Sequence, residues 1–231
     1  MSVSWWTWIR GHKWRLLLFG ITSLLLISPI SEIYNRQDAL ITPPIAALFL
    51  AIIFATAKRK RTIWWLTGLT VNWFVLSRAT TGSGLFAGRS LLAPLLFMVL
   101  LMAIFILLAR WLVRATHVDT EVICAAICGY LLLGMLWLGL YAAVEKVRLL
   151  LHHPSAFVST TMHEIDLGDL LYFSYTTLTT TGYGDIIPRG REVRMLAVIE
   201  AMAGLFYNTI VIARFVGLYG LKNKPTVYSD D

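Results

Sequence analysis

The sequence predicts an all-α polytopic membrane protein, on two features of its composition and one of its patterning. Hydrophobic residues make up 58% of the 231 residues and charged residues only 14%, with a mean hydropathy of +0.70. Soluble domains carry about 25% charged residues. The apolar residues gather into long segments separated by short polar stretches. Helices satisfy their own backbone hydrogen bonds in lipid, so each long apolar segment is expected to cross the membrane as a helix.

Six segments are expected to be transmembrane helices. The first stops near Pro29, and the second begins around Pro43 and Pro44, which suit a first helical turn because proline lacks a backbone N–H. The third is short and rich in tryptophan. The expected spans, in chain order, are 16–30, 39–57, 62–77, 91–113, 122–147 and 193–219.

The basic residues indicate how these spans are oriented. Residues 1–15 mix four tryptophans with arginine and lysine, which predicts an interfacial segment anchoring the first span. This segment, the Lys58–Arg61 run, Arg110 with Arg114, and Lys222 with Lys224 all fall on one side of the expected topology. The positive-inside rule then places both termini in the cytoplasm, although outer loops also carry arginines, among them Arg78, Arg89, Arg189 and Arg191.

The net charge of +7 is therefore interpreted as membrane topology. We expect a multi-pass protein of the cell (plasma or inner) membrane, with membrane lipids as partners and no nucleic acid.

One apolar run does not fit a spanning helix. Leu167–Leu178 is only about half the length that a bilayer requires, so it is expected to be re-entrant. The sequence Thr179-Thr180-Thr181-Gly182-Tyr183-Gly184-Asp185 follows it. Non-helical backbone at membrane depth is tolerated where it lines a water-filled cavity. Glycine permits positive φ, so successive carbonyls can point the same way and replace the water around a dehydrated cation.

This stretch resembles the filter signature of potassium-selective channels, Thr-Val-Gly-Tyr-Gly-Asp. Thr181 stands where that family has valine, and residues 172–178 resemble the helix that precedes the filter. The resemblance covers about residues 118–220. The matching residues are Thr180, Gly182, Tyr183, Gly184 and Asp185.

The resemblance implies a passive potassium-selective ion channel and no enzyme. The carbonyls of Thr180, Thr181, Gly182 and Tyr183, with the Thr180 hydroxyl, are then expected to bind K⁺, and Gly184 to complete the selectivity filter. Asp185 is expected to brace the filter from behind. One chain supplies one quarter of such a ring, so a homotetramer is expected.

Four residues of the last span are singled out. Glu200 is the one carboxylate of this span and is expected to support the re-entrant helix or the filter. Gly204 lies 20 residues after Gly184, an offset that resembles the hinge glycine of that family, so it is expected to serve either as a hinge or for close helix packing. In the same register the resemblance implies that Asn208, one turn later, faces the cavity below the filter; the alternative is an interhelical hydrogen bond. Arg214 is expected to extend to the cytoplasmic interface.

The other regions of the chain bear on what opens the channel. Residues 16–114 are expected to form a four-helix domain in the position of a voltage sensor, followed by a pore domain at 118–220. A sensor needs arginine at every third position within the membrane, but Leu91 to Ala109 carries no charge, so steep voltage gating is not expected. The tail, 221–231, is expected to hold no soluble ligand domain.

Alternatives stay open. The added Thr181 hydroxyl permits a weakly selective monovalent cation channel. A membrane transporter or scaffold subunit is a different class, although a transporter is expected to show paired broken helices. Histidines and acidic residues between the fifth span and the re-entrant helix form a solvated loop, or sense pH or a divalent ion. They are His152, His153, His163, Glu164 and Asp166.

Overall fold

The computed structural model describes residues 12–33, 60–79, 92–160 and 165–222, together with the single positions 46, 50 and 53. The described residues are almost entirely helical. The helices are α2 (Lys13–Ile33), α4 (Lys60–Ala79), α6 (Leu92–Val113), α7 (Thr120–Leu150), α8 (Leu167–Leu178) and α9 (Arg191–Lys222). The strands β1 (Phe157–Ser159) and β2 (Ile186–Pro188) pair antiparallel, with Val158 opposite Ile187.

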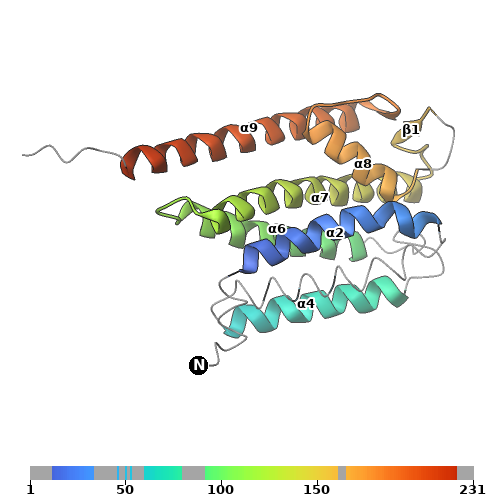
Figure 1. Cartoon of the computed structure of the whole chain (residues 1–231). Coiled ribbons are helices and arrows are strands. Elements are labelled where there is room, and N and C mark those ends of the chain that lie inside the picture. Colours follow the sequence, from blue (N-terminus) through green and yellow to red (C-terminus); the bar gives the residue numbers. More distant parts are fainter. Residues whose placement is uncertain are drawn as a thin grey trace, which may run out of the picture.

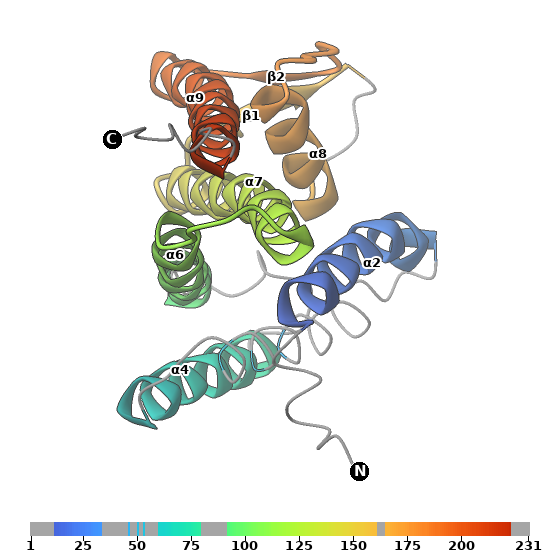
Figure 2. The ribbon, with the colours of Figure 1, turned by 60° about the vertical axis from the view of Figure 1, so that its left-hand side comes forward.

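Helix α7 lies at the centre of the arrangement. It contacts α2, α6, α8 and α9, whereas α4 packs against α6 (Figure 1). Figure 2 shows α2 and α9 on different sides of α7. Three glycines of α7 permit these close contacts, because a Cβ at each would collide with a neighbouring side chain. The collision partner is Tyr207 for Gly129, Tyr175 for Gly134 and Met98 for Gly139.

Three helices within the described residues are long and apolar enough to cross a membrane. They are Leu95–Val113, Thr120–Leu150 and Arg191–Tyr219, and they coincide with the fourth, fifth and sixth expected spans. Helices α2 and α4 cover the first and third expected spans. The interfacial segment before residue 12, the tail beyond residue 222 and the second expected span apart from positions 46, 50 and 53 lie outside the described residues. The chain is thus a mostly helical membrane protein.

Buried clusters hold the helices together, and the two largest join most of them. The larger one joins α2, α4 and α6 to α7, with Trp14, Trp73 and Leu100 among its fully buried side chains. The second lies around the far end of α7, where the rings of Tyr141, Phe157 and Phe173 pack edge-on with centroids 5.1–5.4 Å apart. This aromatic triangle places α8 and β1 against α7.

Two polar junctions join the ends of the helices. Near the start of α7, Glu121 accepts the Trp14 backbone N–H at 3.1 Å and pairs with Arg15 at 2.9 Å. On α9, the Arg214 guanidinium donates to the carbonyls of Val113 and Ala115. Arg214 was expected at the cytoplasmic interface, and the end of α6 to which it bonds is expected on that same side. The last carbonyls of a helix need such donors.

Candidate functional site

The start of α8 is fixed by two aspartates. Asp166 Oδ1 accepts the Asp169 N–H at 2.9 Å, and Asp169 Oδ2 accepts the Asp166 N–H at 3.1 Å. This capping box satisfies free donors of the first turn and places negative charge at the positive end of the helix dipole. The opposite end of α8, with its partial negative charge, therefore leads directly into residues 179–185, called here the TTTGYGD segment.

The N–H groups at the start of the TTTGYGD segment bond back to α8. Thr180 N donates to Thr177 O at 2.9 Å, and Thr181 N and Gly182 N donate to Thr176 O at 2.8 and 3.2 Å. Among the described residues, no recorded hydrogen bond uses the carbonyls of residues 180–183. The segment therefore presents four carbonyl acceptors that no other described residue pairs.

The backbone of the segment alternates in handedness. Thr180, Gly182 and Gly184 have φ of +58°, +51° and +78°, while the residues between them have negative φ. Alternating left- and right-handed residues turn successive N–H groups to one side and, by the same geometry, successive carbonyls to the other. The glycines adopt this conformation without penalty, whereas the β-branched Thr180 carries strain of about 1–3 kcal/mol.

The Thr181 hydroxyl has a partner within the segment. Its oxygen lies 2.9 Å from the Thr179 hydroxyl oxygen, and Thr179 also donates to the Tyr175 carbonyl at 2.7 Å. The hydroxyl that distinguishes Thr181 from the valine of the potassium-channel signature is therefore engaged close to the end of α8.

Asp185 ties the far end of the segment to its surroundings. Tyr172 donates its hydroxyl to Asp185 Oδ2 at 2.7 Å, and this hydrogen bond raises the pKa of Tyr172 to about 12. The Tyr172 ring also stacks on Tyr183, with centroids 6.3 Å apart and planes 6° from parallel. Because its pKa is raised, Tyr172 stays a protonated donor at neutral pH. The Asp185 carbonyl accepts the Thr160 N–H at 2.9 Å, next to the β1–β2 pair.

Glu200 lies where α7, α8 and α9 meet. Its side chain is 0% exposed. Its Oε2 accepts the Tyr141 hydroxyl of α7 at 2.6 Å, and its Oε1 lies 2.6 Å from the Ser174 hydroxyl oxygen of α8. The same Ser174 oxygen is 2.8 Å from the Gly134 carbonyl oxygen. The carboxyl group thus joins the outer helix, the re-entrant helix and α9 at one buried point.

Gly204 and Asn208 lie one turn apart on α9. The nearest atom to a Cβ at Gly204 would be the Leu178 carbonyl oxygen, at colliding distance, so this glycine permits close packing of α9 on the end of α8. The hinge role of Gly204 stays a prediction. The Asn208 side chain is exposed in the single chain and lies near the Tyr130 hydroxyl of α7, and its role also stays a prediction.

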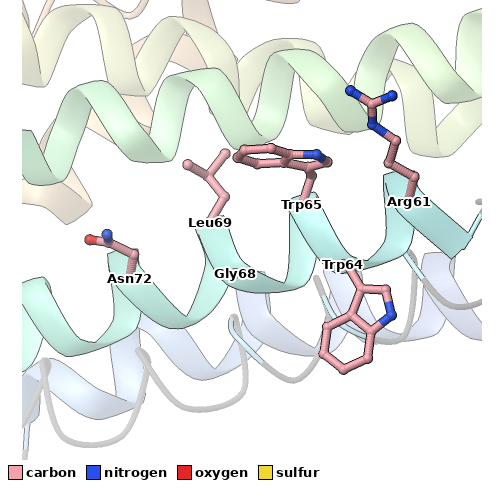
Figure 3. Close-up of a pocket in the computed structure, with 6 residues that line it drawn as sticks. All are labelled: Arg61, Trp64, Trp65, Gly68, Leu69 and Asn72. Carbon is pink, nitrogen blue, oxygen red and sulfur yellow. The ribbon is translucent and has the colours of Figure 1, made fainter.

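Other candidate features lie away from this site. A surface cavity of about 490 Å³ runs along α4 and is lined by Arg61, Trp64, Trp65, Gly68, Leu69 and Asn72 (Figure 3). Trp65 and Arg61 project to one side of α4 and Trp64 to the other. No lining residue belongs to α8, α9 or the TTTGYGD segment. Within the described ranges no three His, Cys, Asp or Glu side chains gather as a metal site, and His163 and Glu164 of the expected loop cluster lie outside them.

The comparisons with known proteins give one match. Residues 122–219, which include most of α7, all of α8, the TTTGYGD segment and most of α9, match a family model described as an ion channel. The match spans less than half of the chain. No curated protein matches the chain, and neither does any solved structure. The match supports an ion-channel function for the part of this membrane protein that carries the site.

Proposed function

We propose that four copies of this chain form a potassium-selective channel in which the TTTGYGD segments line a shared axis. The observation that carries this proposal is the row of carbonyls at residues 180–183, which no described residue pairs and which a backbone of alternating handedness holds. Such a row replaces the hydration shell of a dehydrated cation when several copies face one another. The ligands for K⁺ are the carbonyls of Thr180, Thr181, Gly182 and Tyr183, with the Thr180 hydroxyl at the inner end.

The exposure of α9 supports assembly of several copies. Only 11% of the most apolar 18-residue stretch of α9 is buried within the chain. Large apolar side chains therefore remain for contact with lipid and with other subunits, among them Met195, Met202, Leu205, Phe206, Ile210 and Val216. Residues 180–184 are also exposed in the single chain, including Tyr183 at 72%. A homotetramer brings these segments together around the ion path.

The surroundings of the segment favour a cation. The α8 helix ends at the segment with its partial negative charge, and its acidic N-terminus is stabilised by the capping box. Asp185 and Glu200 support the segment from the outer end and from behind α8. Gly204 and Asn208 belong to the inner helix below it.

The remaining helices complete the proposed channel without sensing voltage. Residues 95–109 of α6 carry no charge, so a change in membrane potential moves no charge on that stretch. We place six spans in the cell membrane with both termini in the cytoplasm, on the distribution of lysine and arginine. Potassium is the permeant ion, and lipids and other copies of the chain are the partners.

The proposal predicts a potassium-dependent reversal potential. The full-length chain, reconstituted into planar bilayers with K⁺ on one side and Na⁺ on the other, is expected to reverse near the potassium equilibrium potential. A reversal potential near zero in that gradient would instead indicate the weakly selective cation channel. The bonding of the Thr181 hydroxyl to Thr179 favours the selective alternative, because that hydroxyl need not seek a partner among the ion ligands. Absence of current would favour the transporter or scaffold reading.

Removing the Tyr172 hydroxyl is expected to weaken the outer end of the filter. Tyr172→Phe keeps the ring that stacks on Tyr183 but loses the hydrogen bond to Asp185. A hydrogen bond to a charged group contributes about 1.5–3 kcal/mol, reduced here because both side chains are accessible to solvent. We expect potassium current that decays severalfold faster during sustained conduction, measured in bilayers.

The matched control for this variant is Tyr219→Phe, which removes a hydroxyl from an exposed tyrosine near the far end of α9. It is expected to behave as the wild type. Equal decay in Tyr172→Phe and the wild type would contradict a supporting role for the Tyr172–Asp185 contact.

A further inference from the structure

The Leu178 carbonyl is the one acceptor at the end of α8 that its own chain segment does not satisfy. The preceding carbonyls of Tyr175, Thr176 and Thr177 accept N–H groups from residues 179–182. Leu178 is 1% exposed, so its carbonyl is shielded from water. The carbonyl accepts the Tyr130 hydroxyl of α7 at 3.0 Å. A buried carbonyl at a helix end requires such a donor.

Three helices meet at this carbonyl. Tyr130 reaches it from α7, and Gly204 brings the backbone of α9 against it. Asn208, one turn after Gly204, interacts with the same Tyr130 hydroxyl. The Leu178 peptide stands two residues before Thr180, where the unpaired carbonyls begin. Its orientation therefore sets the direction in which the backbone enters the segment.

We infer that Tyr130 is a positioning residue for the inner end of the ion path, an inference that rests on the proposed potassium-channel function. Its hydroxyl holds the Leu178 carbonyl towards α7 and so holds the strained Thr180 backbone in place. Without that donor the buried Leu178 carbonyl is left unsatisfied, which favours rotation of the Leu178–Thr179 peptide away from its present orientation. The Thr180 carbonyl and hydroxyl then leave the geometry that binds K⁺.

A second tyrosine in the same helix interface supplies the control. Tyr207 of α9 donates its hydroxyl to the Ala126 carbonyl of α7 at 2.7 Å, and its ring lies 5.8 Å from that of Tyr130. Tyr207→Phe therefore removes a comparable hydroxyl–carbonyl bond between α7 and α9. It leaves the end of α8 untouched, so it separates positioning of the filter from general packing.

The test compares wild type, Tyr130→Phe and Tyr207→Phe as full-length chains in detergent and in bilayers. The first readout is the K⁺ concentration that gives half-maximal thermal stabilisation over a sodium-only buffer, because a bound ion stabilises the folded assembly by linkage. Tyr130→Phe is expected to need about fivefold more K⁺, the equivalent of one lost hydrogen bond. Tyr207→Phe is expected to stay within about twofold of wild type while melting lower in both buffers.

The outcomes separate this inference from the proposed function. Unchanged K⁺ dependence in Tyr130→Phe, or an equal shift in Tyr207→Phe, overturns the role of Tyr130 while wild-type potassium current upholds the channel. A wild type with neither potassium-dependent stabilisation nor current overturns both. If Tyr130→Phe does not assemble, a fluorinated tyrosine at position 130 replaces it. As a stronger donor it is expected to lower the K⁺ requirement, and an unchanged requirement would overturn the inference.

Discussion

Replacing Gly204 by valine is expected to abolish potassium current. A Cβ at this position would collide with the Leu178 carbonyl oxygen, which is backbone and cannot rotate away as a flexible side chain can. The side chain of Leu178 lies close to the same point. Overpacking of this kind costs about 1–3 kcal/mol in a core that relaxes, and more where two helices must separate. Because α8 carries the TTTGYGD segment, its displacement disrupts the segment directly.

Gly217, on the same helix, is the matched control. A Cβ there would meet nothing within 4 Å, so Gly217→Val adds the same side chain to α9 without a collision in the chain. Potassium flux from liposomes and the oligomeric state by size exclusion are measured for both variants. Gly204→Val is expected to lose at least about tenfold in flux, the equivalent of 1.4 kcal/mol, and Gly217→Val to retain most of it. Retained flux in Gly204→Val would contradict the close-packing role.

Replacing Glu200 by leucine is expected to destabilise the protein, whereas glutamine is expected to be tolerated. Leucine leaves the buried Tyr141 hydroxyl without an acceptor and removes one of the two contacts of the Ser174 hydroxyl, which keeps the Gly134 carbonyl. An unsatisfied buried polar group costs about 1–3 kcal/mol. The loss is expected to appear as a lower unfolding temperature and as reduced current.

The tolerance of glutamine follows from counting protons. The Ser174 hydroxyl has one hydrogen, yet its oxygen lies within 2.8 Å of the Gly134 carbonyl and 2.6 Å of Glu200 Oε1. A carbonyl can only accept, so the Ser174 proton goes to Gly134 and the second contact needs a proton from the carboxyl group. Oε2 still accepts from Tyr141. Glutamine reproduces this pattern, with its NH₂ donating to Ser174 and its oxygen accepting from Tyr141.

Comparing the two variants shows whether the Glu200 carboxyl group is protonated or ionised. Unfolding is followed by circular dichroism in one detergent, with tetramer content checked by cross-linking. Glu200→Gln is expected to lie within about 1 kcal/mol of wild type and to conduct. Glu200→Gln as damaging as Glu200→Leu would mean that an ionised carboxylate is required and that Ser174 donates to it.

The local elements of the site could be predicted from the sequence. The re-entrant helix was expected to begin at Leu167, and α8 spans Leu167–Leu178, because the apolar run and its acidic start are encoded within a few residues. Positive φ at Gly182 and Gly184 follows from residue type alone. Glu200 was singled out because a carboxylate inside an apolar helix needs partners, and it has them. Its effect on the filter stays a prediction.

The partners themselves could not be predicted. Tyr130 and Leu178 are 48 residues apart, and Tyr141 and Glu200 are 59 apart, so only the packing of the helices brings each pair together. Nothing in the sequence distinguishes Tyr130 and Tyr141 from the other tyrosines of the chain for these roles. The left-handed Thr180 also gave no local signal, since a β-branched residue disfavours that conformation and surrounding hydrogen bonds must impose it. Strands of three residues such as β1 are too short to show an alternating pattern.

The bond from Arg214 to the end of α6 bears on the order in which the chain is made. The Val113 and Ala115 carbonyls are synthesised about a hundred residues before the guanidinium that satisfies them. A growing chain emerges from the N-terminus onwards, and its early segments fold first. The end of α6 therefore stays incomplete until nearly all of α9 has been translated. Helix α9 therefore completes a helical bundle whose first helices were translated much earlier.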